Sequence, residues 1–286
     1  MADHPVARAG LSAPGYYRVR MPGSFARYRA LGHRTVQGWL EPRVFDLLRT
    51  LTDVQQAGGV EGGAAEIGVH HGQLFVALQL LNPGRPAVAI DVFGDQQLNR
   101  DSSGEGDLAW FRANVERWGD PATLVVRQAD STTLTGDDVR ELAQGPVRLF
   151  SVDGGHTEDV VRTDLRTAEE ALADGGVVVL DDVFNPEWPG VSVGTLRYLD
   201  ADPALEPFAI GFNKVFLTQP PHAATYRTAL RTTFGRRWRV AHKTSVFHGS
   251  DVEVFWPEAL TPRTVLRRNP WARRVWRSLR KRSPDG

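Results

Sequence analysis

Two apolar segments that end in carboxylates constrain the fold of this chain more than any other feature. One ends in Asp153-Gly-Gly-His156, and the other ends in Asp181-Asp182. Short apolar runs bounded by glycine are typical of parallel strands that are covered on both faces. Ligands of such sheets bind just outside the carboxyl ends of the strands. We therefore expect three aspartates and a histidine to meet in one crevice, where a cation would offset the repulsion between the carboxylates.

Strand and helix patterns alternate through the middle of the chain. Strands are expected at 64–69, 87–92, 123–128, 147–152, 176–180, 208–212 and 214–218, and helices at 72–81, 107–118, 137–143, 158–173 and 193–199. The last two strands surround Asn213, which favours a hairpin. The alternation predicts the α/β class, with a doubly wound (Rossmann-like), mostly parallel seven-stranded sheet and an antiparallel edge hairpin.

Extensions are expected on both sides of this sheet. Residues 1–57 are interpreted as an N-terminal arm followed by a helix at 36–52, and residues 58–220 as the ligand-binding domain. Residues 221–261 are interpreted as a C-terminal α/β extension, with a helix at 223–234 and strands at 239–247 and 252–256. Residues 262–286 form a basic amphipathic tail.

Composition narrows the class of protein. The chain contains no cysteine, which excludes disulfides, thiolate metal sites and a cysteine nucleophile. No apolar stretch approaches the roughly 20 residues of a membrane-spanning helix, and the N-terminus lacks the pattern of a secretory signal. We therefore expect a cytoplasmic protein. Association of copies into a homo-oligomer stays open.

The tail from Pro262 concentrates positive charge. It holds nine Lys or Arg and one acid, a charge of +8, so the remainder of this neutral chain carries −8. Trp271, Trp276 and Leu279 share one helical face of the tail. Two interpretations remain: the tail docks on its own domain, or it binds an anionic membrane surface. No nucleic-acid partner is expected, because no recognition module accompanies the basic residues.

The turn after the first expected strand has a sequence suited to ligand binding. It reads Glu66-Ile-Gly68-Val-His70-His-Gly72. Glycines at such a turn let the backbone approach a ligand closely and expose the amides of the following helix. A histidine in the turn either contacts the ligand or orients its neighbours. The turn therefore predicts one end of a nucleotide site.

Acids at the ends of the next two strands extend this site. Asp91 ends the second expected strand, where a carboxylate suits the paired hydroxyls of a ribose. Asp130-Ser131 follows the third strand and would approach an adenine edge. Solvated acids beside tight-turn glycines are the alternative explanation. We prefer the binding site because acids follow successive strands on the same edge of the sheet.

Together these residues resemble the class I S-adenosylmethionine-dependent methyltransferases over roughly residues 60–220. Within that superfamily, the Asp153-Gly-Gly-His156 and Asp181-Asp182 segments are similar to metal-dependent O-methyltransferases of the catechol type. They are also similar to the macrocin-type sugar O-methyltransferases. The chain departs from the catechol type at Asp182, where that type has asparagine, and at His70, which replaces the middle glycine of the usual turn.

The resemblance implies roles for individual residues. S-adenosylmethionine would be held by seven residues: Glu66, Gly68, His70, Gly72, Asp91, Asp130 and Ser131. A magnesium ion would be held by Asp153, Asp181 and Asp182. His156 stands where the catechol type carries a lysine base, so Asp153 and His156 are the expected catalytic residues. An imidazole suits proton removal near neutral pH.

The sequence therefore predicts a magnesium-assisted O-methyltransferase that acts on a hydroxyl of a small molecule. A sugar or glycosylated natural product is the first expectation for the acceptor, and an aryl alcohol is the second. Trp188, in the loop after Asp182, would either stack on the acceptor or plug the end of the sheet. Two alternatives remain for the whole chain: a non-catalytic cofactor-binding or membrane-surface adaptor, and a dinucleotide-dependent oxidoreductase. The second lacks its expected Gly-x-Gly-x-x-Gly sequence.

Overall fold

A single twisted sheet organises the part of the chain that the structure describes. The computed structural model describes residues 24–95, 97–99, 103–235, 239–259, 261 and 274. Its strands are β1 (Gly63–Ile67), β2 (Ala87–Asp91), β3 (Leu124–Gln128), β4 (Val147–Val152), β5 (Leu172–Asp181), β6 (Glu206–Gly211), β7 (Lys214–Thr218), β8 (Val240–Phe247) and β9 (Ser250–Pro257). Their order across the sheet is β3-β2-β1-β4-β5-β7-β6-β9-β8.

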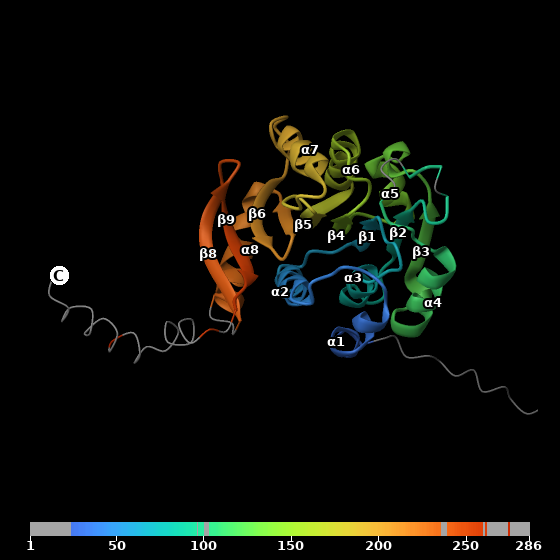
Figure 1. Cartoon of the computed structure of the whole chain (residues 1–286), viewed down its shortest axis with the longest axis horizontal. Helices are drawn as coiled ribbons and strands as arrows, with labels where there is room; N and C mark the ends of the chain where they lie inside the picture. The colour runs from blue at the N-terminus through green and yellow to red at the C-terminus, as the bar shows by residue number, and fades with distance from the viewer. Residues whose placement is uncertain are drawn as a thin grey trace, which may run out of the picture.

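Helices cover both faces of this sheet (Figure 1). They are α1 (Phe25–Ala30), α2 (Val44–Ala57), α3 (Phe75–Leu81), α4 (Leu108–Trp118), α5 (Gly136–Leu142), α6 (Glu158–Ala171), α7 (Pro189–Leu199) and α8 (Pro220–Phe234), with short 3-10 turns η1 (Gly32–Thr35), η2 (Pro121–Thr123) and η3 (Ser131–Thr133). Helices α5, α6 and α7 lie on one face, and α2, α3 and α4 lie on the other (Figure 1). Each face has its own apolar core, because the central strands are buried on both sides.

The parallel strands place their carboxyl ends at one edge of the sheet. Strands β1 to β5 pair in parallel, and β7 pairs antiparallel with β5, with Asp181 opposite Lys214. The turn between β6 and β7 therefore returns to the same edge. This topology confirms the predicted α/β class, with its parallel core and antiparallel hairpin, and brings the strand-end acids together.

The number of strands differs from the expected seven. Strand β9 pairs in parallel with β6 and antiparallel with β8, so the segment 240–257 extends the same sheet to nine strands within the described residues. The hairpin buries Val252 and Phe255 against α8 and β6, which explains why it joins the sheet edge. The sequence of this hairpin predicts its two strands, but it does not predict that β9 pairs with β6.

The helix expected at 36–52 begins only at Val44. Residues 36–43 form an irregular segment that contains Gly38 and Pro42, both poor helix formers. The Gln73 side chain holds this segment: it donates to the backbone oxygen of Val36 (3.1 Å) and accepts from the Leu40 amide (3.0 Å). These bonds replace the ones that a helix would have made.

Several other expectations are confirmed or fall outside the described residues. Asp107 caps α4 by accepting a hydrogen bond from the Trp110 amide (2.7 Å). The expected strand at 64–69 ends at Ile67, so the following glycine belongs to the turn. The basic tail lies outside the described residues except for Arg274. Among the described helices, none is long and apolar enough to cross a membrane.

Candidate active site

A cavity of about 700 Å³ opens at the carboxyl edge of the parallel strands. Its wall includes nine of the ten residues that the sequence assigned to the cofactor or the metal: Glu66, Gly68, His70, Asp91, Asp130, Ser131, Asp153, Asp181 and Asp182, and it also includes His156. Gly72 is the exception. It has φ +87°, and a Cβ there would lie 2.8 Å from the Phe111 ring, so its place in the fold is explained by packing.

Gly68 joins the two halves of the cavity. Its φ is +80°, and a Cβ at this position would lie 1.7 Å from the backbone oxygen of Asp153. The Asp153 amide donates to the Ile67 oxygen (2.9 Å), so the ends of β1 and β4 are held in contact. Only glycine satisfies both the conformation and the close approach.

Asp91 fixes the loops that follow β1 and β2. Its carboxylate accepts hydrogen bonds from the backbone amides of His70 (2.7 Å) and Phe93 (2.5 Å). Burial raises the pKa of Asp91, and these amide bonds oppose the rise. A carboxylate offers about four lone-pair sites, so it retains acceptor capacity toward the cavity. Phe93 itself is buried in the core.

His70 adopts φ +49° and lies against Trp39, with 5.1 Å between the ring centroids. Burial and then the neighbouring His71 lower the pKa of His70, which favours the neutral imidazole.

Asp130 caps η3 by accepting from the amide (2.9 Å) and hydroxyl (2.7 Å) of Thr132. This cap holds the strand end that the sequence assigned to the adenine.

Glu66 is a buried acid with an unpaired oxygen. Glu66 is 2% exposed and is one of the residues that line the cavity, and its buried Oε2 atom has no hydrogen-bond partner. Burial raises the pKa of Glu66 well above its usual range, and the nearby Asp153 carboxyl raises it further. An orphaned carboxylate oxygen at the wall of a cavity fits a ligand that carries positive charge or hydrogen-bond donors.

The acid end of the cavity gathers three donor groups. Ligand atoms of Asp153, His156 and Asp182 all lie within 4.8 Å of one another, a spacing that could hold a metal ion. His156 Nε2 lies 3.4 Å from Asp182 Oδ2. Burial raises the pKa of Asp153 well above its usual range, and the Asp181 carboxyl adds to this rise. The donor set therefore fits a divalent cation.

Asp181 lies beside this cluster and pairs with a residue that the sequence did not single out. The Lys214 ammonium, only 2% exposed, donates to the Asp181 carboxylate. Asn213 donates to both Asp181 and Asp182 from the turn between β6 and β7. The signal that could have found Lys214 is its rarity: the chain has only three lysines, at 214, 243 and 281, and this one lies in an apolar strand.

The loop after β5 closes over the histidine. The Trp188 ring stacks on His156, with 4.3 Å between centroids and 21° between planes. Asn185 donates to Asp182 (3.0 Å), while its oxygen accepts from the Glu187 amide (3.0 Å). Burial raises the pKa of Asp182. Hydrogen bonds from His156, Asn185 and Asn213 outweigh burial and lower this pKa below its usual value.

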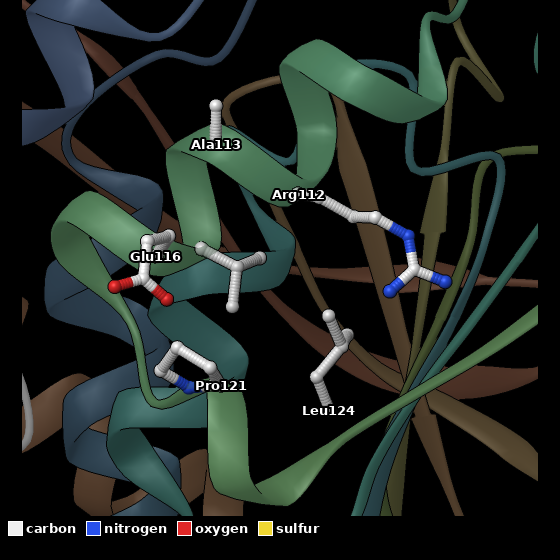
Figure 2. A pocket seen from close by; sticks show the side chains of 6 residues that line it. Arg112, Ala113, Glu116, Pro121 and Leu124 are labelled. Atoms are coloured by element: carbon white, nitrogen blue, oxygen red, sulfur yellow. The ribbon is translucent and has the colours of Figure 1, made fainter.

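The irregular segment before α2 also lines the cavity, which the sequence did not predict. Gln37, Gly38, Trp39 and Leu40 lie on its wall, and the Trp39 side chain is 82% exposed. A second, smaller hollow of about 400 Å³ lies between α4 and the beginning of β3 (Figure 2). It lies by the amino-terminal end of β3, away from the acids at the carboxyl ends of the strands.

Comparison with known proteins agrees with this arrangement. Residues 65–183 match the family described as "Methyltransferase domain". No curated protein sequence matches the chain. Among solved structures, the O-methyltransferase NovP is similar, with 16% identity over 62% of this chain and 80% of NovP, at a TM-score of 0.50.

Two further solved structures are similar at lower TM-scores. CalS11, a TDP-rhamnose 3′-O-methyltransferase, has 20% identity over 68% of this chain and 86% of its own, at a TM-score of 0.46. MycE, solved with Mg and SAH, has 17% identity over 70% of this chain and 55% of its own, at 0.48. Residues 65–183 of this chain therefore match the family of methyltransferase domains, in a fold similar to that of NovP.

Proposed function

We propose that this protein is a magnesium-assisted O-methyltransferase that methylates a hydroxyl of a small molecule. The observation that carries the proposal is the juxtaposition of two sites in one cavity. The turn at Gly68 and the acids of β1 to β3 line one half, and Asp153, His156 and Asp182 line the other. The backbone contact between Gly68 and Asp153 joins the halves.

The cofactor half suits S-adenosylmethionine, which supplies a methyl group on a positively charged sulfur. Glu66, which the resemblance assigns to the methionine part, lines this half and has an unpaired buried oxygen. Asp91 would accept the ribose hydroxyls with its remaining lone pairs. Asp130 and Ser131 would approach the adenine. The protein thus contributes orientation and electrostatics, and the cofactor carries the reactive group.

The acid half suits the activation of a hydroxyl. A divalent cation, when bound, lowers the pKa of a nearby hydroxyl and fixes its oxygen. The carboxylates that would hold the cation come from Asp153, after β4, and Asp182, after β5. His156 would accept the hydroxyl proton through its imidazole, a side chain that suits proton removal near neutral pH. Asp182, whose Oδ2 atom lies 3.4 Å from His156 Nε2, would stabilise the imidazolium that forms.

The mouth of the cavity favours a sugar or glycosylated acceptor over a plain aryl alcohol. Trp39 offers an exposed aromatic ring, and Trp188 places a second aromatic ring against His156. Polar side chains of Asn99, Glu187 and Asn213 lie on the same wall. A ring with several hydroxyls can use both kinds of group, because aromatic faces pack on apolar ring faces and amides bond to hydroxyls.

Calorimetric titration with S-adenosylmethionine and, separately, with NAD tests the cofactor. We expect binding of the first alone; binding of NAD alone would support an oxidoreductase. An acceptor screen with the radiolabelled methyl donor then tests turnover with Mg²⁺ and with EDTA. Asp153→Ala should remove the activity, and Asp174→Ala, at an exposed acid, should keep it. Cofactor binding without turnover on any acceptor would favour the adaptor, and full activity in EDTA would end the metal role.

A further inference from the structure

Lys214 is a buried cation in the middle of the strand-end acids. It begins β7, and its side chain is 2% exposed on the cavity wall. Burial alone would lower the pKa of Lys214, but Asp181 first and then Asp153 raise it above its ordinary value. Glu66 acts in the same direction from the cofactor half. A lysine that stays charged without water needs such partners.

Hydrogen bonds occupy both oxygens of Asp181. Oδ1 accepts from the Asp182 amide (2.9 Å) and from the Asn213 amide group (3.2 Å), and Oδ2 accepts from the Lys214 ammonium. Three hydrogen bonds, one of them from the Lys214 ammonium, therefore hold the Asp181 carboxylate in place. It also lies outside the group of donors that approach one another within 4.8 Å, which contains Asp153, His156 and Asp182.

We propose that Lys214 is a positioning residue that holds Asp181 out of the metal's coordination shell, so that Asp153 and Asp182 are the carboxylate ligands. This inference rests on the proposed magnesium assistance. Two carboxylates are enough, because Mg²⁺ in proteins usually keeps several waters and takes one or two carboxylates. The arrangement departs from the three-carboxylate set that the resemblance implies.

Cysteine substitution with cadmium identifies the ligand positions directly. The chain has no cysteine, so any thiolate-to-cadmium charge-transfer absorption comes from the residue introduced. We expect the band to appear when Cd²⁺ is added to Asp153→Cys or to Asp182→Cys. We expect no band when Cd²⁺ is added to Asp181→Cys. Asp174→Cys, at an exposed acid, is the control for non-specific binding. A band from Asp181→Cys as strong as that from Asp182→Cys would overturn the inference.

A second measurement uses the unmutated protein and so avoids any failure of a variant to fold. With only three lysines, the side-chain ammonium of Lys214 can be followed by ¹⁵N NMR and assigned with Lys214→Arg. We expect its slowly exchanging, hydrogen-bonded signal to persist after Mg²⁺ shifts the His156 ring signals. Loss of the ammonium signal on Mg²⁺ addition would mean that Asp181 leaves Lys214 for the ion. If neither Mg²⁺ nor Cd²⁺ changes any signal, the metal role in the proposed function fails, and this inference fails with it.

Discussion

Replacing Gly68 with alanine tests whether the contact between β1 and β4 builds the site. The glycine has φ +80°, and a methyl group there would lie 1.7 Å from the Asp153 oxygen. Ordinary carbon–oxygen contacts need about twice that separation, so the two strand ends must part. Parting them would break the hydrogen bond from the Asp153 amide to the Ile67 oxygen (2.9 Å) and displace the Asp153 carboxylate.

The magnitude follows from comparison with a glycine that lacks the contact. Gly84 has φ +72°, but a Cβ there would meet nothing within 4 Å. Left-handed backbone costs an alanine about 1–2 kcal/mol, and the loss of unfolded-state entropy returns about 0.4–1 kcal/mol. We therefore expect Gly84→Ala to lower the free energy of unfolding by about 1 kcal/mol. Gly68→Ala carries an added overpacking cost of about 1–3 kcal/mol, giving a loss of about 3 kcal/mol.

Chemical denaturation and titration with S-adenosylhomocysteine measure both effects. We expect Gly84→Ala to leave the dissociation constant unchanged. Gly68→Ala should weaken binding by at least about tenfold, which corresponds to 1.4 kcal/mol. The reasoning is refuted if the two variants lose the same stability and bind the ligand equally well, because the contact with Asp153 would then have no energetic role.

Three further expectations address the base, the buried acid and the tail. His156→Ala should lower kcat by about 10²- to 10⁴-fold while leaving the dissociation constant of the cofactor unchanged; an unchanged kcat in a turnover assay would remove it as the base. Because the pKa of Glu66 is raised in the folded protein, the folded state binds more protons than the unfolded state, and stability falls as pH rises above about 4.3, the unfolded value. Glu66→Gln should flatten that fall when urea unfolding is compared at pH 5 and pH 8, and an identical slope would contradict the assignment. If the tail binds anionic membranes, deleting the residues after Pro262 should weaken sedimentation with phosphatidylserine vesicles; equal sedimentation would favour a tail docked on its own domain.

The sequence predicted the central strands because each is a short, continuous apolar run between turn residues. Burial on both faces imposes that pattern on a central parallel strand, so the positions of β1, β2 and β4 could be read directly. Strand β5 begins at Leu172, inside the helix expected at 158–173. The attachment of β9 to β6 could not be predicted. Edge pairing depends on which surfaces meet in three dimensions, and residues 250–257 carry no local mark of their partner. The helix predicted from hydrophobic spacing was also wrong over residues 36–43, where hydrogen bonds to the Gln73 side chain replace helical hydrogen bonds.

The strand-end acids were predictable because parallel strands place their carboxyl ends on one edge. Glu66, Asp91 and Asp153 follow from strand order alone. Lys214 did not follow, because its position depends on the antiparallel register that sets it opposite Asp181. A lysine next to a turn normally indicates a solvated side chain. Only the register turns it inward, toward acids that lie more than 30 residues away along the chain.

Charge balance links the two halves of the cavity. If Glu66, Asp153, Asp181 and Asp182 are all ionised, Lys214 offsets one charge and leaves three negative charges unbalanced. S-adenosylmethionine brings one positive charge on sulfur, and a divalent cation brings two. In the protein alone, burial raises the pKa of Glu66 and Asp153 well above their usual range, which favours their protonated forms. A bound cation stabilises their ionised forms and lowers those pKa values.

Binding of S-adenosylmethionine at pH 7 should therefore release more protons than binding of S-adenosylhomocysteine, which lacks the sulfur charge. Calorimetry in two buffers of different ionisation enthalpy measures the difference. Equal proton release from the two ligands would mean that the buried acids do not sense the methyl donor.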